Sequence, residues 1–310
     1  MTSDVAARQV SPGISPREGK TVTGRAISAL RKSRLATAGA ILVGLFIIMA
    51  IVGPYVAPYN PSATSVYQLT SPSGLYLLGT TQSGQDVLSQ LLSGAGSSLE
   101  LGFLTAAFAT VLSVVVGVPS GYFSGVAGES LSSLANVFLV VPALPLIIVI
   151  MAYLPNRGVL TMAVVISVTG WAWGARQLRA QTMSLRRRDD IVAARAIGEK
   201  TWRIMFVEMM PSLLPIIISG FLFTTVFAIV TEASLAFLGL TDVSSWSWGT
   251  MLYWAQNDQA FTLGAWWWYI PPGLCIALVG MGLGLINFGI DELINPRLKV
   301  QRNKQRGSAR

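Results

Sequence analysis

Six stretches of this chain are apolar over lengths that can cross a membrane, and no other feature limits the fold as strongly. The hydrocarbon core of a bilayer is about 30 Å thick, so a helix needs about 20 apolar residues to cross it. The stretches are residues 35–57, 99–123, 131–154, 159–178, 213–238 and 268–290. Charged residues make up only 12% of the chain, against about 25% in soluble domains. The sequence therefore predicts an all-α integral membrane protein with six transmembrane helices.

Two prolines lie inside the third apolar stretch, Pro142 and Pro145. A proline inside a helix removes one backbone donor, and its ring clashes with the preceding turn. We therefore expect the third helix to be kinked.

Positive charges fall almost entirely on one side of such a bundle. If the chain starts in the cytoplasm and crosses six times, cytoplasmic segments hold 21 of the 22 Lys and Arg residues, and only Arg157 lies outside. Lys and Arg concentrate in the cytoplasmic segments of membrane proteins. We therefore predict a multi-pass protein of the plasma (inner) membrane with both termini cytoplasmic. Because the net charge of +8 follows sidedness, it does not indicate nucleic-acid binding.

The same stretches give the domain organisation. Residues 35–57 are interpreted as a retained signal anchor, because a cleaved secretory signal would lie nearer the N-terminus. The other parts are basic cytoplasmic tails at 1–34 and 291–310, an extracytoplasmic segment at 58–98 and a core at 99–290. The core includes a cytoplasmic loop at 184–211 and an outer Trp-rich loop at 239–267.

The residue types that carry most enzyme chemistry are scarce. The chain has no histidine and one cysteine, Cys275, which excludes intramolecular disulfides, histidine-based catalysis and zinc sites that use histidine. A phosphate-binding P-loop has four residues between its glycines, whereas five separate Gly13 from Gly19. We predict no catalytic residues, no metal site and no cofactor bound by this chain.

The 184–211 loop is rich in both signs of charge and has the pattern helix, glycine turn, helix. A first helical face would hold Ile191, Ala193, Ala194 and Ile197. Gly198 would allow a turn, and a second apolar face would begin with Trp202, Met205, Phe206 and Met209. Pro211 suits the first turn of the next helix. These residues alone leave two interpretations open, a docking surface for a partner or an amphipathic linker on the bilayer.

Several motifs in order resemble one family. The run Ala193-Ala194, Gly198 and Pro211 resembles the "EAA" loop of ABC-importer permeases. The chain is similar to the C-type permeases of dipeptide, oligopeptide and nickel importers over roughly residues 30–300. The segments that carry the similarity are SRLATAGAILVGLF at 33–46, LGTTQSGQDVLSQLLSGAGSSLELG at 78–102, DDIVAARAIG at 189–198, TEASLAFLGL at 231–240, SWGTML at 247–252 and DELINPRL at 291–298.

This resemblance implies a MetI-like five-helix core preceded by one additional N-terminal helix. It also implies a homologous second permease, two ABC ATPase subunits that bind ATP and Mg, an extracytoplasmic substrate-binding protein and surrounding membrane lipid. The loop would act as a coupling helix seated on the ATPase. Its candidate coupling residues are Asp190, Ala193, Ala194, Gly198, Trp202, Phe206, Glu208 and Pro211.

Three positions depart from the family pattern. Val192 stands where the loop's name has Glu, and Glu208 stands where relatives often have His. Both change polarity at or beside the expected ATPase contact. Gln85 replaces a common Arg in the first outer segment, which puts any ion pair made by that Arg in doubt.

The outer side offers candidates for the solute path or its gate. Glu232 is an ionisable residue within an apolar stretch, which marks it as a functional candidate; the alternative is a residue at headgroup depth. Trp246, Trp248 and Trp254 either stack on a solute or form an interfacial aromatic belt.

The predicted function is a permease subunit that forms half of the path for oligopeptides in an ATP-driven importer. One alternative keeps the machinery and imports oligosaccharides, because aromatic faces stack on sugar rings. Nickel has less support, since the chain has no histidine. A stand-alone secondary carrier or channel is a further alternative, which the sparse membrane acids disfavour.

Overall fold

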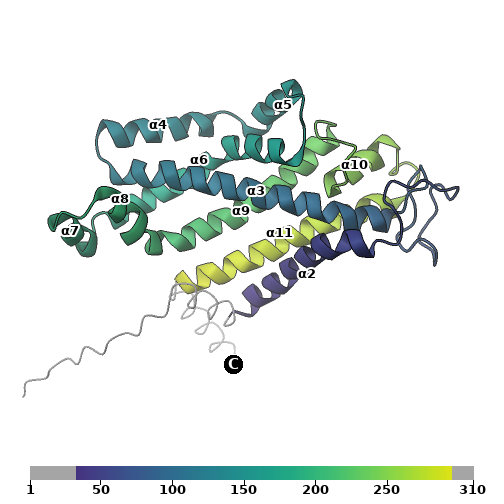
Figure 1. The fold of residues 1–310 in the computed structure, drawn as a ribbon, viewed down its shortest axis with the longest axis horizontal. Coiled ribbons are helices and arrows are strands. Elements are labelled where there is room, and N and C mark those ends of the chain that lie inside the picture. Colours follow the sequence, from purple (N-terminus) through teal and green to yellow (C-terminus); the bar gives the residue numbers. More distant parts are fainter. Residues whose placement is uncertain (1–32, 295–310) are drawn as a thin grey trace, which may run out of the picture.

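The computed structural model describes residues 33–294 and is helical almost throughout. Figure 1 shows long helices lying along one another, with short elements gathered at both ends. The helices are α2 (Arg34–Val56), α3 (Val87–Tyr122), α4 (Val126–Val140), α5 (Ala143–Tyr153), α6 (Val159–Leu185), α7 (Asp189–Ala196), α8 (Thr201–Arg203), the π-helical turn η1 (Ile204–Glu208), α9 (Met210–Phe237), α10 (Trp248–Asn257) and α11 (Trp266–Ile294).

Five of these helices are long and apolar enough to cross a membrane alone, namely α2, α3, α6, α9 and α11. A sixth candidate is the pair α4 and α5, which is bent by 82° at its break. The predicted kink is thus a full break. Pro142 precedes α5 as its N-cap residue. Pro145 lies in the first turn of α5, where its missing N–H would have had no helical partner, so it adds no second kink.

The second membrane helix begins much earlier than the apolar stretch predicts. The sequence places its start at residue 99, whereas α3 starts at Val87. Asp86 caps it, because its carboxylate accepts hydrogen bonds from the Ser89 N–H at 2.8 Å and the Ser89 hydroxyl at 2.6 Å. Ser, Gln and Gly residues fill the first turns, so hydropathy alone does not reveal them. The outer segment without regular structure is therefore shorter than residues 58–98.

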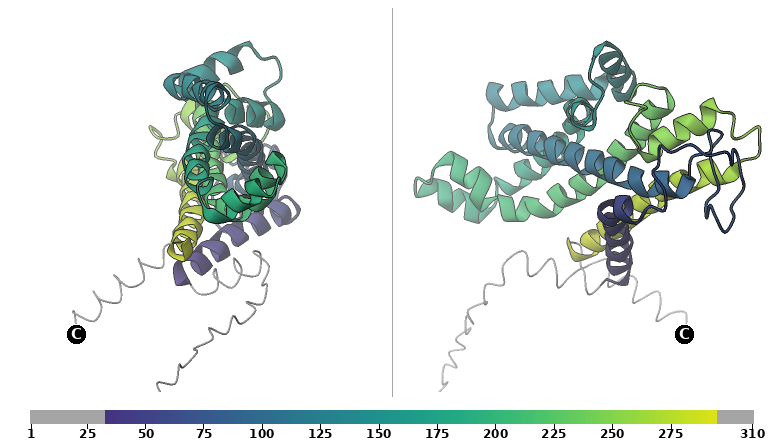
Figure 2. Two further views of the ribbon diagram at one scale, coloured as in Figure 1. Left: turned by 90° about the vertical axis from the view of Figure 1, so that its left-hand side faces the viewer. Right: turned by 45° about the vertical axis from the view of Figure 1, so that its right-hand side comes forward.

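The long helices pack around α3. It lies against α6 along most of its length, and α9 packs against both of them. On the other side α2 pairs with α11, as Figures 1 and 2 show. The loop elements α7, α8 and η1 form one end of the bundle, and α10 and the segment before α3 form the other. The fold thus places α7, α8 and η1 a full helix length away from α10 and the segment before α3.

The contact between α2 and α11 depends on glycine. A Cβ at Gly39 would lie 2.5 Å from the Gly282 carbonyl oxygen, which is far closer than van der Waals contact allows. We therefore expect Gly39→Leu to push α2 away from α11 and to cost about 1–3 kcal/mol, as overpacking usually does. Thermal unfolding of the purified protein would register this as a loss of several degrees.

Gly44→Leu on the same helix is the matched control for Gly39→Leu. No atom lies within 4 Å of the position that a Cβ at Gly44 would take. This variant should unfold within about a degree of the parent. Equal unfolding temperatures for the two variants would contradict a glycine-dependent contact.

Candidate functional site

The 184–211 loop projects from one end of the bundle on a buried apolar base. Ile191, Ile204, Met205 and Met209 are buried there, in a cluster with residues near the ends of α3 and α6. The loop is therefore fixed to the membrane helices rather than lying loose beside them. This arrangement lets a displacement of the loop act directly on α3, α6 and α9.

A glycine turn joins α7 to α8, in agreement with the sequence pattern. Gly198 has a φ of +83°, a left-handed conformation that residues with a Cβ disfavour. The Glu199 N–H donates to the Ala194 carbonyl at 3.1 Å and closes the end of α7. The second helix differs from a regular one, because three residues of α8 pass directly into the π-helical turn η1. Pro211 lies in the first turn of α9, where it was predicted.

Most of the candidate coupling residues are exposed on this loop. Ala194 and Phe206 are half-buried, whereas the indole of Trp202 is 57% exposed. The Asp190 carboxylate accepts two hydrogen bonds from the Arg188 guanidinium, at 3.1 and 3.0 Å, in a bidentate ion pair. The remaining exposed candidates are Ala193, Gly198, Glu208 and Pro211.

Two residues of the predicted first face, Ala193 and Ile197, are exposed instead. Ala193 follows Ile191 by two positions, and residues two apart in a helix do not share a face. Ile197 is 82% exposed, whereas Ile191 is buried. The reason is that α7 ends at Ala196, so Ile197 no longer follows helical spacing. The loop thus presents Ile197 and Trp202 outward, and both are apolar side chains of the kind that fill pockets on a partner.

A groove that sequence reasoning missed lies along the middle of the bundle; we call it the mid-helix groove. It has a volume of about 620 Å³ and is walled by the break between α4 and α5, by α6 and by α9, with one residue from α11. Its lining residues are Phe138, Leu139, Val141, Pro142, Ala143, Thr169, Gly170, Trp173, Gly174, Gln177, Ser219, Gly220, Phe223, Thr224, Phe227 and Asn287.

The groove combines aromatic and amide side chains. Trp173 and Phe223 stack with ring centroids 5.8 Å apart, and both are exposed. The Ser219 hydroxyl bonds to the Asn287 side chain at 2.5 Å, and Gln177 also lines the wall. Such a wall can contact apolar groups and can exchange hydrogen bonds with a polar chain. The amides Gln177 and Asn287 within apolar stretches were the available sequence signal.

At the opposite end, Glu232 is buried in a polar cluster. Its Oε1 accepts a hydrogen bond from the Ser247 hydroxyl at 2.7 Å, and its Oε2 has no partner among the residues described. Ser247 also caps α10, because its hydroxyl accepts from the Thr250 N–H while its own N–H donates to the Thr250 hydroxyl. The carboxylate therefore joins α9 to the start of α10.

The three candidate tryptophans have different environments. Trp248 is completely buried, packs edge-on against Phe46 at 5.7 Å and donates its indole N–H to the Leu91 carbonyl. It is a core residue in this structure and presents no face to a solute. Trp246 and Trp254 are half-buried and line a separate cavity of about 210 Å³.

This outer cavity also contains an acidic group. Asp258 lines it together with Gln85 and Gln90, and burial raises the pKa of the Asp258 carboxyl above its usual range. Gln85 accepts a hydrogen bond from the Gln90 side-chain amide at 2.8 Å. At position 85, where the resemblance implied an Arg, this chain therefore has a neutral hydrogen-bond pair.

The Ser247 link between α9 and α10 gives a stability prediction. Ser247→Ala would remove the α10 cap, worth about 1 kcal/mol, and would leave the buried Glu232 carboxyl without that partner, at about 1–3 kcal/mol. Thermal unfolding should therefore fall by several degrees. Ser245→Ala is the control, since this exposed hydroxyl bonds only to the Asp242 carbonyl at 2.8 Å. Equal effects of the two changes would refute the link.

Comparisons with known proteins extend the similarity beyond these sites. A family model described as "Binding-protein-dependent transport system inner membrane component" matches residues 109–300. A second, "N-terminal TM domain of oligopeptide transport permease C", matches residues 21–72. The oligopeptide transport system permease protein OppC of Bacillus subtilis (strain 168) is 30% identical over 277 residues, which cover 88% of this chain and 89% of that protein.

Another relative agrees. The di/tripeptide transport system permease protein DppC of Pseudomonas aeruginosa (strain UCBPP-PA14) is 33% identical over 274 residues, which cover 85% of this chain and 88% of that protein. Among solved structures, a chain of the MetNI methionine ABC transporter in an inward-facing conformation has a TM-score of 0.52 at 18% identity, covering 67% of this chain and 95% of that chain.

These matches confirm the predicted family and the predicted MetI-like fold. The solved structure supports the fold alone, and the family model and the curated relatives support the family. Proteins of this family are inner membrane components with several spans, and they are permease subunits rather than catalysts. The chain belongs to the family of binding-protein-dependent transport system inner membrane components, as an OppC/DppC-type permease.

Proposed function

We propose that this chain forms half of the path through which an ATP-driven importer takes up oligopeptides. The observation that carries the proposal is the mid-helix groove, a cavity of about 620 Å³ in a chain whose relatives are named as oligopeptide and dipeptide permeases. A peptide has a polar backbone and varied side chains. Gln177 and Asn287 suit the backbone amides, and the Trp173–Phe223 stack suits apolar side chains.

A homologous second permease would complete the path by closing over the open side of the groove. Two ABC ATPase subunits would dock on the 184–211 loop, and a substrate-binding protein would dock at the other end, near α10. ATP and Mg would be bound by the ATPases. In this arrangement both termini are cytoplasmic, which accords with the distribution of Lys and Arg.

The loop has the properties that mechanical coupling requires. Its outward side offers Ile197 and Trp202 as apolar anchors, and its inward side is packed against the bundle. ATP would favour the closed arrangement of the ATPases, because a ligand shifts a conformational equilibrium only through different affinities for its two states. Movement of the docked loops would then carry α6 and α9, which wall the groove.

Uptake into proteoliposomes tests this proposal. The vesicles would contain the assembled complex with its binding protein and would be offered labelled oligopeptides, cello- or manno-type oligosaccharides, or nickel, with and without internal ATP. We expect uptake of peptides that depends on ATP. Uptake of sugar or nickel alone would overturn the cargo, and uptake without ATP would favour a secondary carrier or channel.

A variant within the groove links this transport to the path. Asn287→Leu removes the hydrogen bond to Ser219 and one polar group of the groove wall. We expect peptide uptake to fall severalfold while the ATPase subunits still assemble, as judged by co-purification. Asn257→Leu, on the exposed end of α10, is the matched control. An undiminished uptake by Asn287→Leu would separate the groove from the path.

A further inference from the structure

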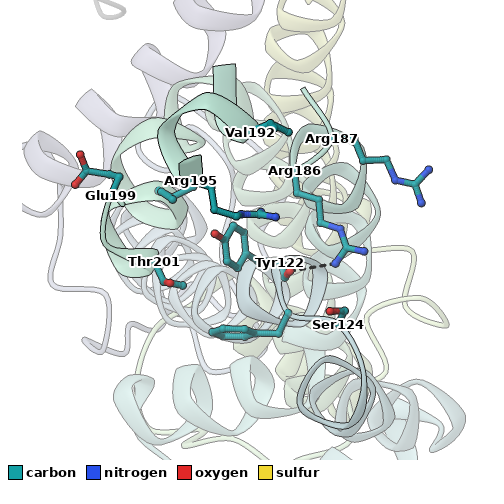
Figure 3. Close-up of a pocket in the computed structure, with 10 residues that line it drawn as sticks. Tyr122, Ser124, Arg186, Arg187, Val192, Arg195, Glu199 and Thr201 are labelled. Atoms are coloured by element: carbon teal, nitrogen blue, oxygen red, sulfur yellow. Dashed lines mark hydrogen bonds between the residues drawn. The ribbon is translucent and has the colours of Figure 1, made fainter. Parts of the chain in front are cut away.

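A basic pocket lies where the 184–211 loop meets the end of the bundle. Its volume is about 660 Å³. One wall is the end of α3 and the turn after it, Tyr122 to Ser124, and the other holds Arg186 and Arg187 after α6 and residues of α7. Figure 3 looks into this pocket. Because two candidate membrane spans, α3 and α6, end here, a bilayer crossed by these helices would have its headgroup layer near the pocket.

The pocket carries positive charge that the protein does not neutralise. Arg186, Arg187 and Arg195 line it, and none of them forms an ion pair with any residue in 33–290. The acidic residue of the lining, Glu199, pairs instead with Arg203 at 3.5 Å. In Figure 3 the Glu199 carboxylate points away from the arginines. Like charges held together favour a bound anion.

Two of the arginines are fixed in orientations that leave donors free. One guanidinium nitrogen of Arg186 donates hydrogen bonds to the carbonyl oxygens of Gly121 and Tyr122, at 3.4 and 3.1 Å. The Arg195 guanidinium lies over the Tyr122 ring, 5.1 Å from its centroid. In Figure 3 the Arg195 head group lies by the Tyr122 ring and the Arg186 head group lies toward Ser124, whereas Arg187 extends outward. A guanidinium has five donors, so most of this pair's hydrogen bonds remain available.

The rest of the lining suits an amphiphile. The hydroxyls of Ser124 and Thr201 add polar groups, and Phe123, Val192 and Ile204 add an apolar wall. Planar guanidinium groups match the oxygens of a phosphate. Basic pockets between membrane helices are sites where phosphorylated headgroups bind. We infer that this pocket binds the phosphate of an anionic phospholipid headgroup, beside the loop that docks the ATPase.

The phosphate could belong to a lipid headgroup or be free inorganic phosphate, and the position of the pocket at the ends of α3 and α6 favours the headgroup. A lipid arrives from the bilayer at the level of Tyr122 and brings glycerol and acyl carbons for the apolar wall. Inorganic phosphate would bind to the arginines and would leave the apolar wall without a contact. Lipid binding in this pocket does not depend on which cargo the importer carries. It gives the membrane a direct contact with the element proposed to transmit ATP-driven motion.

Binding of labelled phosphatidylglycerol to the purified full-length chain in detergent tests the inference, with phosphatidylcholine and inorganic phosphate as the comparison ligands. Arg195→Gln removes one free cation and should weaken phosphatidylglycerol binding about fivefold. Adding Arg187→Gln should weaken it further. Neither side chain donates a hydrogen bond within residues 33–290, and the contact of the exposed Arg195 with the Tyr122 ring is worth about 0.5–1 kcal/mol, so thermal unfolding without lipid should fall by no more than a few degrees. Lys200→Gln is the matched control, an exposed cation of the same loop that does not line the pocket.

The supporting result is a preference for phosphatidylglycerol that Arg195→Gln reduces and Lys200→Gln leaves within twofold. An equal loss of phosphatidylglycerol binding in Arg195→Gln and Lys200→Gln would mean that the lipid responds only to the general surface charge, and the proposed site would be wrong. Displacement of the lipid by inorganic phosphate at similar concentration would overturn the headgroup as the source. If Arg195→Gln instead weakens only the assembly with ATPase subunits, an acidic segment of the ATPase occupies the pocket and the lipid assignment is wrong.

Discussion

A Gly198→Val variant is expected to lose ATP-driven uptake almost completely while its helix bundle stays folded. The effect comes from the backbone, because no atom lies within 4 Å of the position a Cβ at Gly198 would take. An L-residue in the left-handed conformation costs about 1–2 kcal/mol, and a β-branched side chain fits it worst. The equilibrium constant for forming the turn between α7 and α8 would therefore fall about tenfold. Uptake in proteoliposomes and co-purification of the ATPases measure the loss.

Gly198→Asn separates this backbone effect from the mere presence of a side chain. Asparagine visits the left-handed region far more readily than valine, so this variant should keep most of its uptake. Thermal unfolding of Gly198→Asn should match the parent, and that of Gly198→Val should fall by no more than a few degrees. Normal uptake and normal substrate-stimulated ATPase activity in Gly198→Val would remove the loop from the coupling mechanism.

Trp248→Ala should produce a large loss of stability. Truncating a fully buried tryptophan costs about 3–5 kcal/mol. Here the change would also empty the space beside Phe46 and leave the Leu91 carbonyl without the indole donor. We expect little monodisperse protein after purification and an unfolding temperature lower by about ten degrees. Scanning calorimetry and size-exclusion chromatography provide the measurements.

Two variants test the assignment of Trp248 to the core. Trp248→Phe keeps an aromatic ring against Phe46 and should recover most of the stability. Trp254→Ala alters a half-buried residue of the outer cavity that packs against the core and donates its indole N–H to the Val243 carbonyl, so it should lower the unfolding temperature clearly less than Trp248→Ala does. If Trp248→Ala is as stable as the parent and loses only uptake, then this tryptophan serves the solute rather than the fold.

The predictions from sequence succeed where a local pattern decides the structure. Apolar length marks the membrane helices, Pro142 marks the break after α4, and Gly198 marks the turn in the loop. Each of these features depends on residues that are close in the chain. The prediction that Ile197 shares the first helical face is wrong, because periodicity cannot locate the end of α7 at Ala196. The start of α3 was missed for a related reason, since Asp86 caps a helix whose first turns mix Ser, Gln and Gly with Val and Leu.

The mid-helix groove and the role of Trp248 could not be predicted, because both depend on contacts between distant segments. The groove takes walls from four parts of the chain, and Gln177 and Asn287 lie 110 residues apart in the sequence. Trp248 lies in a Trp-rich loop that indicates an exposed surface, yet it packs against Phe46 and bonds to Leu91. Only the tertiary arrangement separates it from Trp246 and Trp254.

The break between α4 and α5 has a mechanical consequence for the size of the passage. Helices of 15 and 11 residues are about 22 and 16 Å long, so neither crosses the hydrocarbon alone. Their joint, at Val141 and Pro142, forms part of the groove wall. Rotation about a few backbone bonds there would change the width of the groove without sliding a long helix past its neighbours. If the groove is the path proposed above, such a hinged wall would let it adjust to cargo of different widths.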